Sequence, residues 1–343
     1  MNFGKIKKVF LFGGSKILLD CARIAIKRKL KVFVFTSKRH IMEKITTDEK
    51  TLKDLLNKER IKFFVTKDIN KSKELIRLID DTSIGIGFGE AWSFSEAIIR
   101  KFRNKLIDYM GIRLPQYRGG AHYTWKILRK NVIGCCNLQL INKDMIQGKY
   151  DSGEILKSEE FLFPADVRVP KDYIDFANKK AIEFLKSFFY DLEKNKEFQL
   201  FPLQENFSVY YPRLYTKIHG FINWNWDTIE IENFICAFDE PYAGASTFIN
   251  GKRVFLKDCV SDYNDGNFHP FQSGLIYKTN NNLIFVCTKT GTLIIKKVLN
   301  EDGKNIISKL LSGQRFYTPL KYLEEALKFS AEYTAEGINK KLL

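Results

Sequence analysis

The chain has 343 residues, of which 45% are hydrophobic and 28% are charged. This composition is that of an ordinary globular protein, and it excludes a collagen-like, mucin-like or fully disordered chain. The length suggests two domains, each large enough to bury its own core without disulfide or metal staples.

The charge balance is strongly basic, with 56 Lys and Arg residues against 40 Asp and Glu residues and a formal net charge of +16. Such an excess is typical of proteins that bind RNA, phosphorylated sugars or membrane surfaces. The lysines are scattered and form no run of five or six, so a compositional bias of the whole chain is a competing explanation.

Targeting and metal-binding patterns are missing from the sequence. We find no signal peptide and no apolar run near the roughly 18 residues that a membrane span needs, which predicts a cytoplasmic protein without membrane insertion. The six cysteines form no C-x-x-C pair and no ligand spacing with a histidine, so no metal site is expected.

The first half of the chain alternates short apolar strands with helical patterns. A strand at 9–11 leads into a Gly-Gly pair at 13–14, a helix follows, and a second strand occupies 31–35. Units of this kind predict a parallel sheet, although the dinucleotide fingerprint G-x-G-x-x-G is absent. Further strands are expected at 61–65, 83–89, 106–114, 133–140 and 155–163, and helices at 73–79, 96–105, 121–129 and 171–192. We therefore predict an α/β fold, a Rossmann-like and mostly parallel sheet with flanking helices.

The character of the sequence changes after residue 194. A short helix at 229–238 precedes short strands that are broken by turns, at 245–249, 254–260, 274–279, 283–287 and 292–298. This pattern predicts a small β-barrel. We place an N-terminal catalytic domain at 1–200, a C-terminal barrel at 201–318, and a closing helix with a loose tail at 319–343.

Two polar stretches are candidate functional sites. Residues 114–125 read Leu-Pro-Gln-Tyr-Arg-Gly-Gly-Ala-His-Tyr-Thr-Trp, so that a strand end and two glycines lead into a helix N-terminus, which suits an anionic ligand. Asp151 lies in a polar loop at 143–154, at the edge where α/β sheets bind ligands. Each stretch also has a structural explanation, a glycine-dependent loop for the first and an Asx turn for the second.

Taken together and in this order, these stretches resemble the family that transfers a formyl group from N10-formyltetrahydrofolate to an amine, which includes methionyl-tRNA formyltransferase and the sugar N-formyltransferases. Leu-Pro-Gln-Tyr-Arg-Gly at 114–119 matches the second half of the family pattern Asn-x-His-x-Ser-Leu-Leu-Pro-x-x-Arg-Gly, and Asp-Ser-Gly at 151–153 matches its later Asp-x-Gly. Gly-Phe-Gly-Glu-Ala-Trp at 87–92 resembles the folate-side strand end. Asp-Glu-Pro-Tyr-Ala-Gly-Ala at 239–245 resembles the entry into an OB-like barrel.

The resemblance, which covers residues 5–300, implies an enzyme with N10-formyltetrahydrofolate as the formyl donor and no metal. It implies that Asp151 is catalytic and that the donor lies against Gly87, Phe88, Gly89, Trp92 and Asp151. The residues expected to bind the acceptor substrate are Met110, Arg118, Gly119, Tyr211 and Arg213.

The catalytic motif departs from the family pattern at two positions. Counting back from Pro115, the family's Asn falls on Asp108 and its His on Met110. In the family reaction the Asn amide and an imidazolium stabilise a tetrahedral oxyanion, while the Asp supports the His. Met110 can neither donate a hydrogen bond nor take a proton, and an ionised Asp108 would repel the oxyanion.

Three interpretations follow from this departure. In the first, His122 replaces the missing imidazole and pairs with Asp151, which would make Asp108, His122 and Asp151 the catalytic set; His122 could equally cap or pack its helix. In the second, the fold is kept but formyl transfer is lost. In the third, another one-carbon or acyl unit is transferred.

The segments at 119–125 and 208–213 resemble the sugar enzymes more than the tRNA enzymes. The resemblance therefore implies transfer to the amine of a nucleotide-linked amino sugar, as in surface polysaccharide or lipopolysaccharide biosynthesis. Methionyl-tRNA is the alternative acceptor, because the basic charge and an OB-like barrel would suit RNA. An inactive folate- or nucleotide-binding homologue is the second alternative. Sugar formyltransferases often pair, so a homodimer is compatible with the resemblance, whereas the sugar and its nucleotide cannot be named from the sequence.

Overall fold

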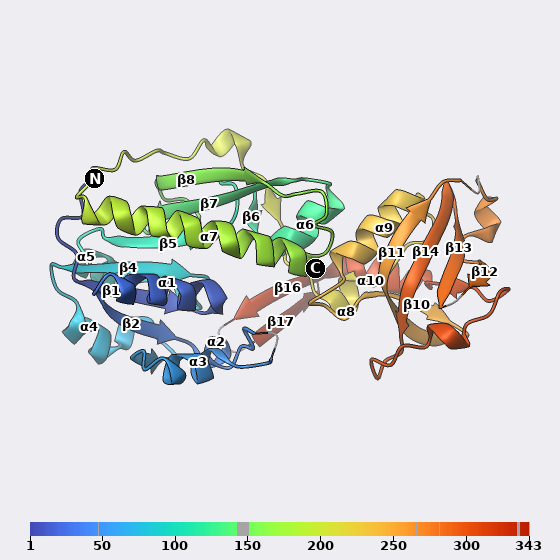
Figure 1. Ribbon diagram of the computed structural model, residues 1–343, viewed down its shortest axis with the longest axis horizontal. Coiled ribbons are helices and arrows are strands. Elements are labelled where there is room, and N and C mark those ends of the chain that lie inside the picture. The colour runs from blue at the N-terminus through green and yellow to red at the C-terminus, as the bar shows by residue number, and fades with distance from the viewer. Residues whose placement is uncertain (47, 143–150, 265–266, 281, 335–336, 343) are drawn as a thin grey trace.

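The computed structural model describes residues 1–46, 48–142, 151–264, 267–280, 282–334 and 337–342. An α/β unit that holds the N-terminus and a β unit lie next to each other along the long axis of the molecule (Figure 1). The polar loop expected at 143–154 falls partly on residues 143–150, which are outside the described residues.

A seven-stranded sheet with the order β3-β2-β1-β4-β5-β7-β8 forms the centre of the α/β unit. The first five strands along this order pair in parallel, whereas β7 and β8 run antiparallel at one edge. The prediction of a mostly parallel sheet is thereby confirmed. The strands are β1 (Lys8–Gly13), β2 (Lys31–Thr36), β3 (Phe63–Val65), β4 (Ser83–Phe88), β5 (Leu106–Met110), β7 (Ile133–Leu140) and β8 (Ile155–Leu162).

Alternate residues of β1 face two different helical layers, as the two-residue period of a strand requires. Val9 and Leu11 pack in a cluster with α1 (Ser15–Lys27), α3 (Leu52–Lys58) and α7 (Pro170–Glu193), whereas Phe10 and Phe12 pack in a second cluster with α4 (Lys73–Leu78) and α5 (Glu96–Lys101). Because both faces of the sheet are covered, its inner strands are mostly apolar, and the polar residues within them, such as Asp108, stand out. The remaining elements of this unit are α2 (Lys38–Ile41), a 3₁₀ turn at Ile69–Lys71, β6 (Arg118–Gly119) and α6 (His122–Leu128).

The β unit is a six-stranded antiparallel sheet with the order β12-β13-β14-β11-β10-β15, packed against α9 (Thr228–Ala237). Two backbone hydrogen bonds of 2.8 Å, from Ile276 N to the Gln314 carbonyl and from Phe316 N to the Gly274 carbonyl, link the two ends of the sheet. The sheet therefore curls around its core, as expected of a small barrel. Its strands are β10 (Ala245–Ile249), β11 (Lys252–Asp262), β12 (Ile276–Asn280), β13 (Leu283–Thr288), β14 (Gly291–Leu299) and β15 (Phe316–Tyr317), with 3₁₀ turns at Pro270–Gln272 and Ile307–Lys309.

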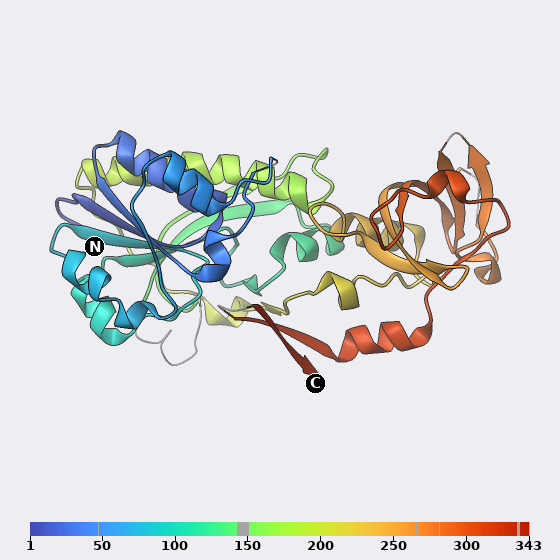
Figure 2. The same ribbon diagram turned by 90° about the horizontal axis from the view of Figure 1, so that it is seen from below.

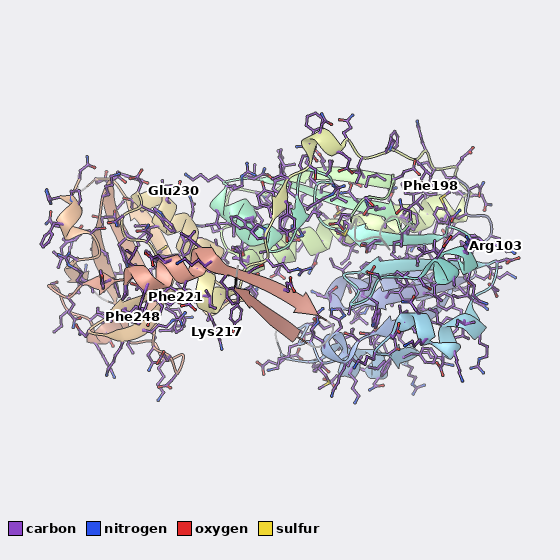
Figure 3. All side chains as sticks on the ribbon, turned by 180° about the vertical axis from the view of Figure 1, so that it is seen from behind. Arg103, Phe198, Lys217, Phe221, Glu230 and Phe248 are labelled. Atoms are coloured by element: carbon purple, nitrogen blue, oxygen red, sulfur yellow. The ribbon has the colours of Figure 1, made fainter. Side chains whose placement is uncertain are left out.

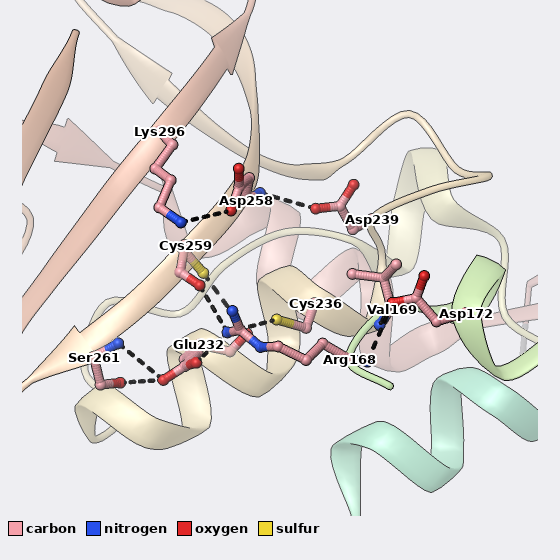
Figure 4. A network of polar contacts seen from close by, with 10 residues as sticks. All are labelled: Arg168, Val169, Asp172, Glu232, Cys236, Asp239, Asp258, Cys259, Ser261 and Lys296. Atoms are coloured by element: carbon pink, nitrogen blue, oxygen red, sulfur yellow. Dashed lines mark hydrogen bonds and ion pairs between the residues drawn. The ribbon is translucent and has the colours of Figure 1, made fainter. Parts of the chain in front are cut away.

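The two units share one hydrophobic core. Phe163 and Tyr173 of the α/β unit belong to the same buried cluster as Phe234 and Ile235 of α9. Arg168 crosses this junction: its guanidinium pairs with Glu232 and donates a 2.8 Å hydrogen bond to the Cys259 carbonyl (Figure 4). The junction is thus an extension of the core with a charged pair at its edge.

The chain returns from the β unit toward the α/β unit at its C-terminal end (Figure 2). Phe221 and Phe248 lie together on the β unit (Figure 3), and Tyr322 of α10 (Leu320–Lys328) stacks on both with centroid distances of 4.7 and 4.9 Å. β16 (Phe329–Thr334) and β17 (Gly337–Leu342) then form a hairpin, so the prediction of a loose tail is wrong. A 3₁₀ turn at Glu205–Phe207, β9 (Tyr210–Tyr211) and α8 (Thr216–His219) lie between the units in the chain.

Two other predicted elements end earlier than expected. The helix predicted at 96–105 stops at Lys101, because Arg103 and Asn104 adopt positive φ values of 53° and 62°, which a helix does not allow. The strand predicted at 106–114 stops at Met110. Across the described residues, no helix combines the length and the apolar character that crossing a membrane requires.

Candidate functional site

A cavity of about 1370 Å³ opens at the carboxyl end of the parallel strands. The chain leaves β1, β4 and β5 at this end, and residues that follow each strand contribute to the cavity wall. Ligands bind at this edge in open α/β sheets. The cavity wall includes Gly14, Ser15, Arg39, His40, Glu43, 88–94, 108–112, 118–123, Asp151, Ser152, Glu205, Tyr210 and Arg213.

Four of the five residues expected to bind the donor line this cavity, namely Phe88, Gly89, Trp92 and Asp151. Phe88 stacks on Tyr109 with a centroid distance of 5.6 Å, and Trp92 donates a 2.9 Å hydrogen bond from its indole nitrogen to the Lys67 carbonyl. Gly89, with a φ of 61°, leaves open space where a side chain would begin. Gly87 lies behind this wall in β4, so it shapes the cavity without lining it.

Arg118 also lines the cavity, but its guanidinium is engaged by the protein itself. It forms a bidentate salt bridge with the Glu205 carboxylate, with nitrogen–oxygen distances of 2.6 and 2.8 Å. It donates a 2.9 Å hydrogen bond to the backbone carbonyl oxygen of Asp151. It also donates to the Ser208 hydroxyl at 3.0 Å. Arg118 therefore holds the Asp151 loop and the segment at 205–208 against the strand end.

The other residues expected to bind the acceptor occupy different positions. Met110, Gly119 and Arg213 line the cavity, whereas Tyr211 does not; its ring stacks on Tyr117 with a centroid distance of 5.2 Å in a small buried cluster. The neighbouring residue Tyr210 lines the cavity instead. Because side chains alternate along a strand, a one-residue difference in β9 exchanges the buried and the exposed ring.

His122 lies at the first turn of α6 and lines the cavity. Burial, with the nearby charges of Arg213 and Lys126, lowers the pKa of its imidazole to about 4. Its Nδ1 atom is inaccessible to solvent and has no hydrogen-bond partner. Among the described residues, no hydrogen bond or ion pair joins His122 to Asp151, so the structure places both in one cavity without the expected pairing.

Three carboxyl groups meet in this cavity. Burial, together with the charge of Asp151, raises the pKa of Glu90 to about 7, and burial with the charges of Glu90 and Asp151 raises the pKa of Asp108 well above its usual value. Burial also raises the pKa of Asp151, against the lowering effect of Arg118 and Arg213. Clustered carboxyl groups with raised pKa values are typical of functional sites.

Glu90 and Gln139 are site residues that the sequence interpretation missed. Gln139 of β7 is fully buried, lies opposite Asp108 in the register, and donates a 2.8 Å hydrogen bond to the Gly153 carbonyl. A polar residue inside a predicted apolar strand was the available signal for Gln139. Glu90 directly follows the glycine-rich end of β4. Its approach to Asp108 of β5 exists only in the folded sheet, so the sequence does not reveal it.

A second polar group lies beside the N-terminus of α1, at the same cavity. His40 is 5% exposed; Arg39 donates a 2.7 Å hydrogen bond to its Nε2 atom, and Nδ1 has no partner. Glu43 lines the cavity beside it. The spacing of His40 in the sequence matches no motif, so nothing there indicates a role for it. Among the described residues, no three His, Cys, Asp or Glu side chains are arranged to hold a metal ion.

Comparisons with known proteins identify this architecture. The model of the formyl transferase C-terminal domain matches residues 215–315. The methionyl-tRNA formyltransferase of Ruminiclostridium cellulolyticum is 27% identical over 201 residues, which are 58% of this chain and 61% of that protein. The methionyl-tRNA formyltransferase of Malacoplasma penetrans is 25% identical over 326 residues, which are 91% of this chain and 95% of that protein.

A solved structure agrees with these relatives. The N-formyltransferase from Helicobacter canadensis, crystallised with folinic acid and dTDP-3-aminofucose, superposes with a TM-score of 0.62 at 18% identity, and the match covers 84% of this chain and 98% of that one. The sheet with its cavity and the curled C-terminal sheet thus define the formyltransferase fold. The chain is therefore similar to formyltransferases over nearly its whole length, and its residues 215–315 match the formyl transferase C-terminal domain.

Proposed function

We propose that the protein transfers a formyl group from N10-formyltetrahydrofolate to the amine of a nucleotide-linked amino sugar. The observation that carries this proposal is one cavity that joins the donor wall at Phe88 and Trp92 to Asp151 and to Arg213. Its volume of about 1370 Å³ exceeds the roughly 300–1,000 Å³ typical of a pocket for one small ligand, so it has room for donor and acceptor together.

The reaction forms one carbon–nitrogen bond and breaks another. The acceptor nitrogen attacks the formyl carbon, a tetrahedral oxyanion forms, and the bond from that carbon to N10 then breaks. The acceptor nitrogen loses a proton and N10 gains one. Asp151 is the proposed proton carrier, because its raised pKa brings the carboxyl closer to the range in which it both takes and returns a proton.

The proposed roles of the other site residues follow from their charge and position. His122 is neutral at physiological pH because its pKa is about 4, so it acts as a hydrogen-bonding group rather than as an imidazolium. Arg213 lines the same cavity and supplies a cation for the phosphates of a nucleotide. Asp108 faces the reacting carbonyl from the position of the family's Asn.

The test is an assay of the purified protein with N10-formyltetrahydrofolate and a panel of nucleotide-linked amino sugars, read by mass spectrometry of the formamide. We expect one acceptor to be formylated. Asp151→Asn should lower kcat by about 10²- to 10³-fold, the usual effect of losing a group that serves the transition state. Formylation of none of these acceptors would contradict the proposal.

Methionyl-tRNA is the second candidate acceptor, favoured by the names of the two sequence relatives and by the charge of +16. The same assay with charged initiator tRNA distinguishes the two. Donor binding without transfer to either class would indicate an inactive homologue. The proposal includes action in the cytoplasm during surface polysaccharide or lipopolysaccharide synthesis, and a homodimer, which light scattering would test.

A further inference from the structure

Gly87 provides the space in which two carboxyl groups approach each other. A Cβ atom at this position would lie 2.5 Å from Glu90 Oε2 and 2.7 Å from Asp108 Oδ1. Gly87 is paired with Asp108 in the register of β4 and β5, while Glu90 follows the end of β4. Both oxygens therefore turn toward the one point where the strand carries no side chain.

Backbone N–H groups of Glu90 and Tyr109 act on these two carboxyl groups and partly offset the rise of their pKa values, but the oxygens beside Gly87 are not satisfied. Glu90 Oε2, Asp108 Oδ1 and Gln139 Oε1 are all inaccessible to solvent, and none has a hydrogen-bond partner. The Gln139 amide nitrogen is already used by the Gly153 carbonyl. Leaving buried acceptors unpaired destabilises the folded protein, and two ionised carboxylates that face the same point would also repel each other. A proton on a carboxyl group converts an acceptor into a donor and removes both costs.

We propose that Glu90 and Asp108 form a neutral acid pair in the active enzyme, in which Glu90 donates a hydrogen bond to Asp108 Oδ1 and Asp108 donates one to the formyl oxygen. This inference rests on the proposed formyl transfer. Asp108 is then a catalytic residue, because it touches the reacting carbonyl, and Glu90 is a positioning residue that acts through it. No proton is transferred in this step; the hydrogen bond strengthens as negative charge develops on the oxygen.

The charged groups around the pair favour its neutral form. Burial is the largest effect on both residues, and the Asp151 carboxylate on the facing loop adds to it. The cations Arg118 and Arg213 act on Asp151. From β7, the neighbour of Asp108 is the uncharged Gln139. A neutral acid at position 108 offers the donor that an amide supplies in the family pattern, without the charge that would repel an oxyanion.

The first test needs no substrate. Infrared spectra of the purified protein below pH 7 should contain the carbonyl band of a buried carboxylic acid, and Asp108→Asn should remove the Asp108 component. Asp81→Asn is the matched control, because Asp81 is exposed at the opposite end of β4 and pairs with Arg103 at 2.7 Å. A wild-type spectrum without a protonated carboxyl band would overturn the inference, whether or not the protein transfers formyl groups.

The second test is the dependence of kcat on pH. In the wild type, kcat should fall as the pH rises through about 7, where Glu90 loses its proton. Glu90→Gln keeps a permanent donor to Asp108, so this decline should move to higher pH by at least about one unit. Asp108→Ala should lower kcat by about 10²- to 10³-fold, and Asp108→Asn by less than about tenfold. An alkaline decline that is the same in the wild type and in Glu90→Gln would contradict the role of Glu90.

Discussion

His40 shows how burial fixes the protonation state of a single residue. Its pKa is lowered to about 4, chiefly by burial and then by the charge of Arg39. The unfolded chain takes up a proton near pH 6.5, whereas the folded chain does so only near pH 4. Between these values protonation favours the unfolded state, so the stabilising contribution is complete above pH 6.5 and is lost as the pH falls.

We therefore expect protonation of His40 to lower the free energy of unfolding by about 1–3 kcal/mol between neutral pH and pH 4. His40→Gln should flatten that part of the stability curve, measured by urea unfolding. His269→Gln is the control, because His269 is exposed. An equal acid dependence in wild type and His40→Gln would show that His40 is not the group responsible.

At the level of residues, motif spacing predicted Asp151, Arg118 and Gly119 at one site, and it placed Asp108 there as a departure from the pattern. It could not predict Glu90, because the approach of Glu90 to Asp108 depends on the missing Cβ of Gly87 in the folded sheet. It also selected Tyr211 rather than Tyr210, since the sequence does not say which of two adjacent rings faces the cavity.

The short pairing of β6 with β9 fixes one wall of the cavity. Arg118 and Gly119 pair in parallel with Tyr210 and Tyr211, and Gly119 adopts a φ of 105°. A Cβ atom at Gly119 would collide with the Tyr211 carbonyl oxygen. The side chain that glycine lacks would therefore separate the two strands.

Gly119→Ala should destabilise the protein by about 1–3 kcal/mol, because it adds a collision to the strain of a positive φ. It should also raise the KM for the acceptor more than that for the donor. Gly303→Ala is the matched control: Gly303 has a φ of 76° but open space around it, so only the conformational strain of about 1 kcal/mol is expected. Equal thermal shifts in the two variants would argue against the collision.

Among the elements, regular periodicity gave the best predictions. β7 was predicted at its observed bounds, and α7 begins and ends one residue outside its predicted range. The ends of β5 and α5 were wrong, because positive φ values and loop geometry end these elements rather than any loss of apolar character. The C-terminal hairpin was missed because its polar sequence resembles a tail, although its two strands are neighbours in the chain.

The whole molecule is held together at the junction of its two units. Glu232 of α9 pairs with Arg168 and also accepts a 2.9 Å hydrogen bond from the Ser261 backbone nitrogen. The carboxylate is largely buried, with 13% of its side chain exposed. Removing the guanidinium would leave this buried charge without its cation.

Arg168→Met should lower the free energy of unfolding by about 1–3 kcal/mol while the transition stays single, because both units contribute to one core cluster. Arg103→Met is the control: its pair with Asp81 is exposed, and a change of at most about 1 kcal/mol is expected. Calorimetry would reveal the opposite outcome as two separate transitions, which would mean that the units unfold independently.

At this scale the sequence predicted the family and the order of the two architectures, because the four motif stretches are spread along nearly the whole chain. The residues that line the cavity for the acceptor substrate could not be predicted in the same way. Tyr210 lines the same cavity as Arg39 and His40 of α2, and no spacing in the sequence indicates that these two segments meet. The full lining of the cavity is therefore an arrangement that exists only in the folded chain.

The antiparallel strand at the edge of the central sheet bears on how the protein behaves at high concentration. β8 closes the sheet, and Ser158, Glu159 and Glu160 along it are exposed. An open edge can recruit a strand from another copy and start aggregation, and charged side chains along that edge oppose it. Neutralising Glu159 and Glu160 would leave the residues of the cavity in place and yet make the protein more prone to aggregate through β8. Resistance to aggregation therefore depends on the edge strand, whereas the site depends on the carboxyl ends of inner strands.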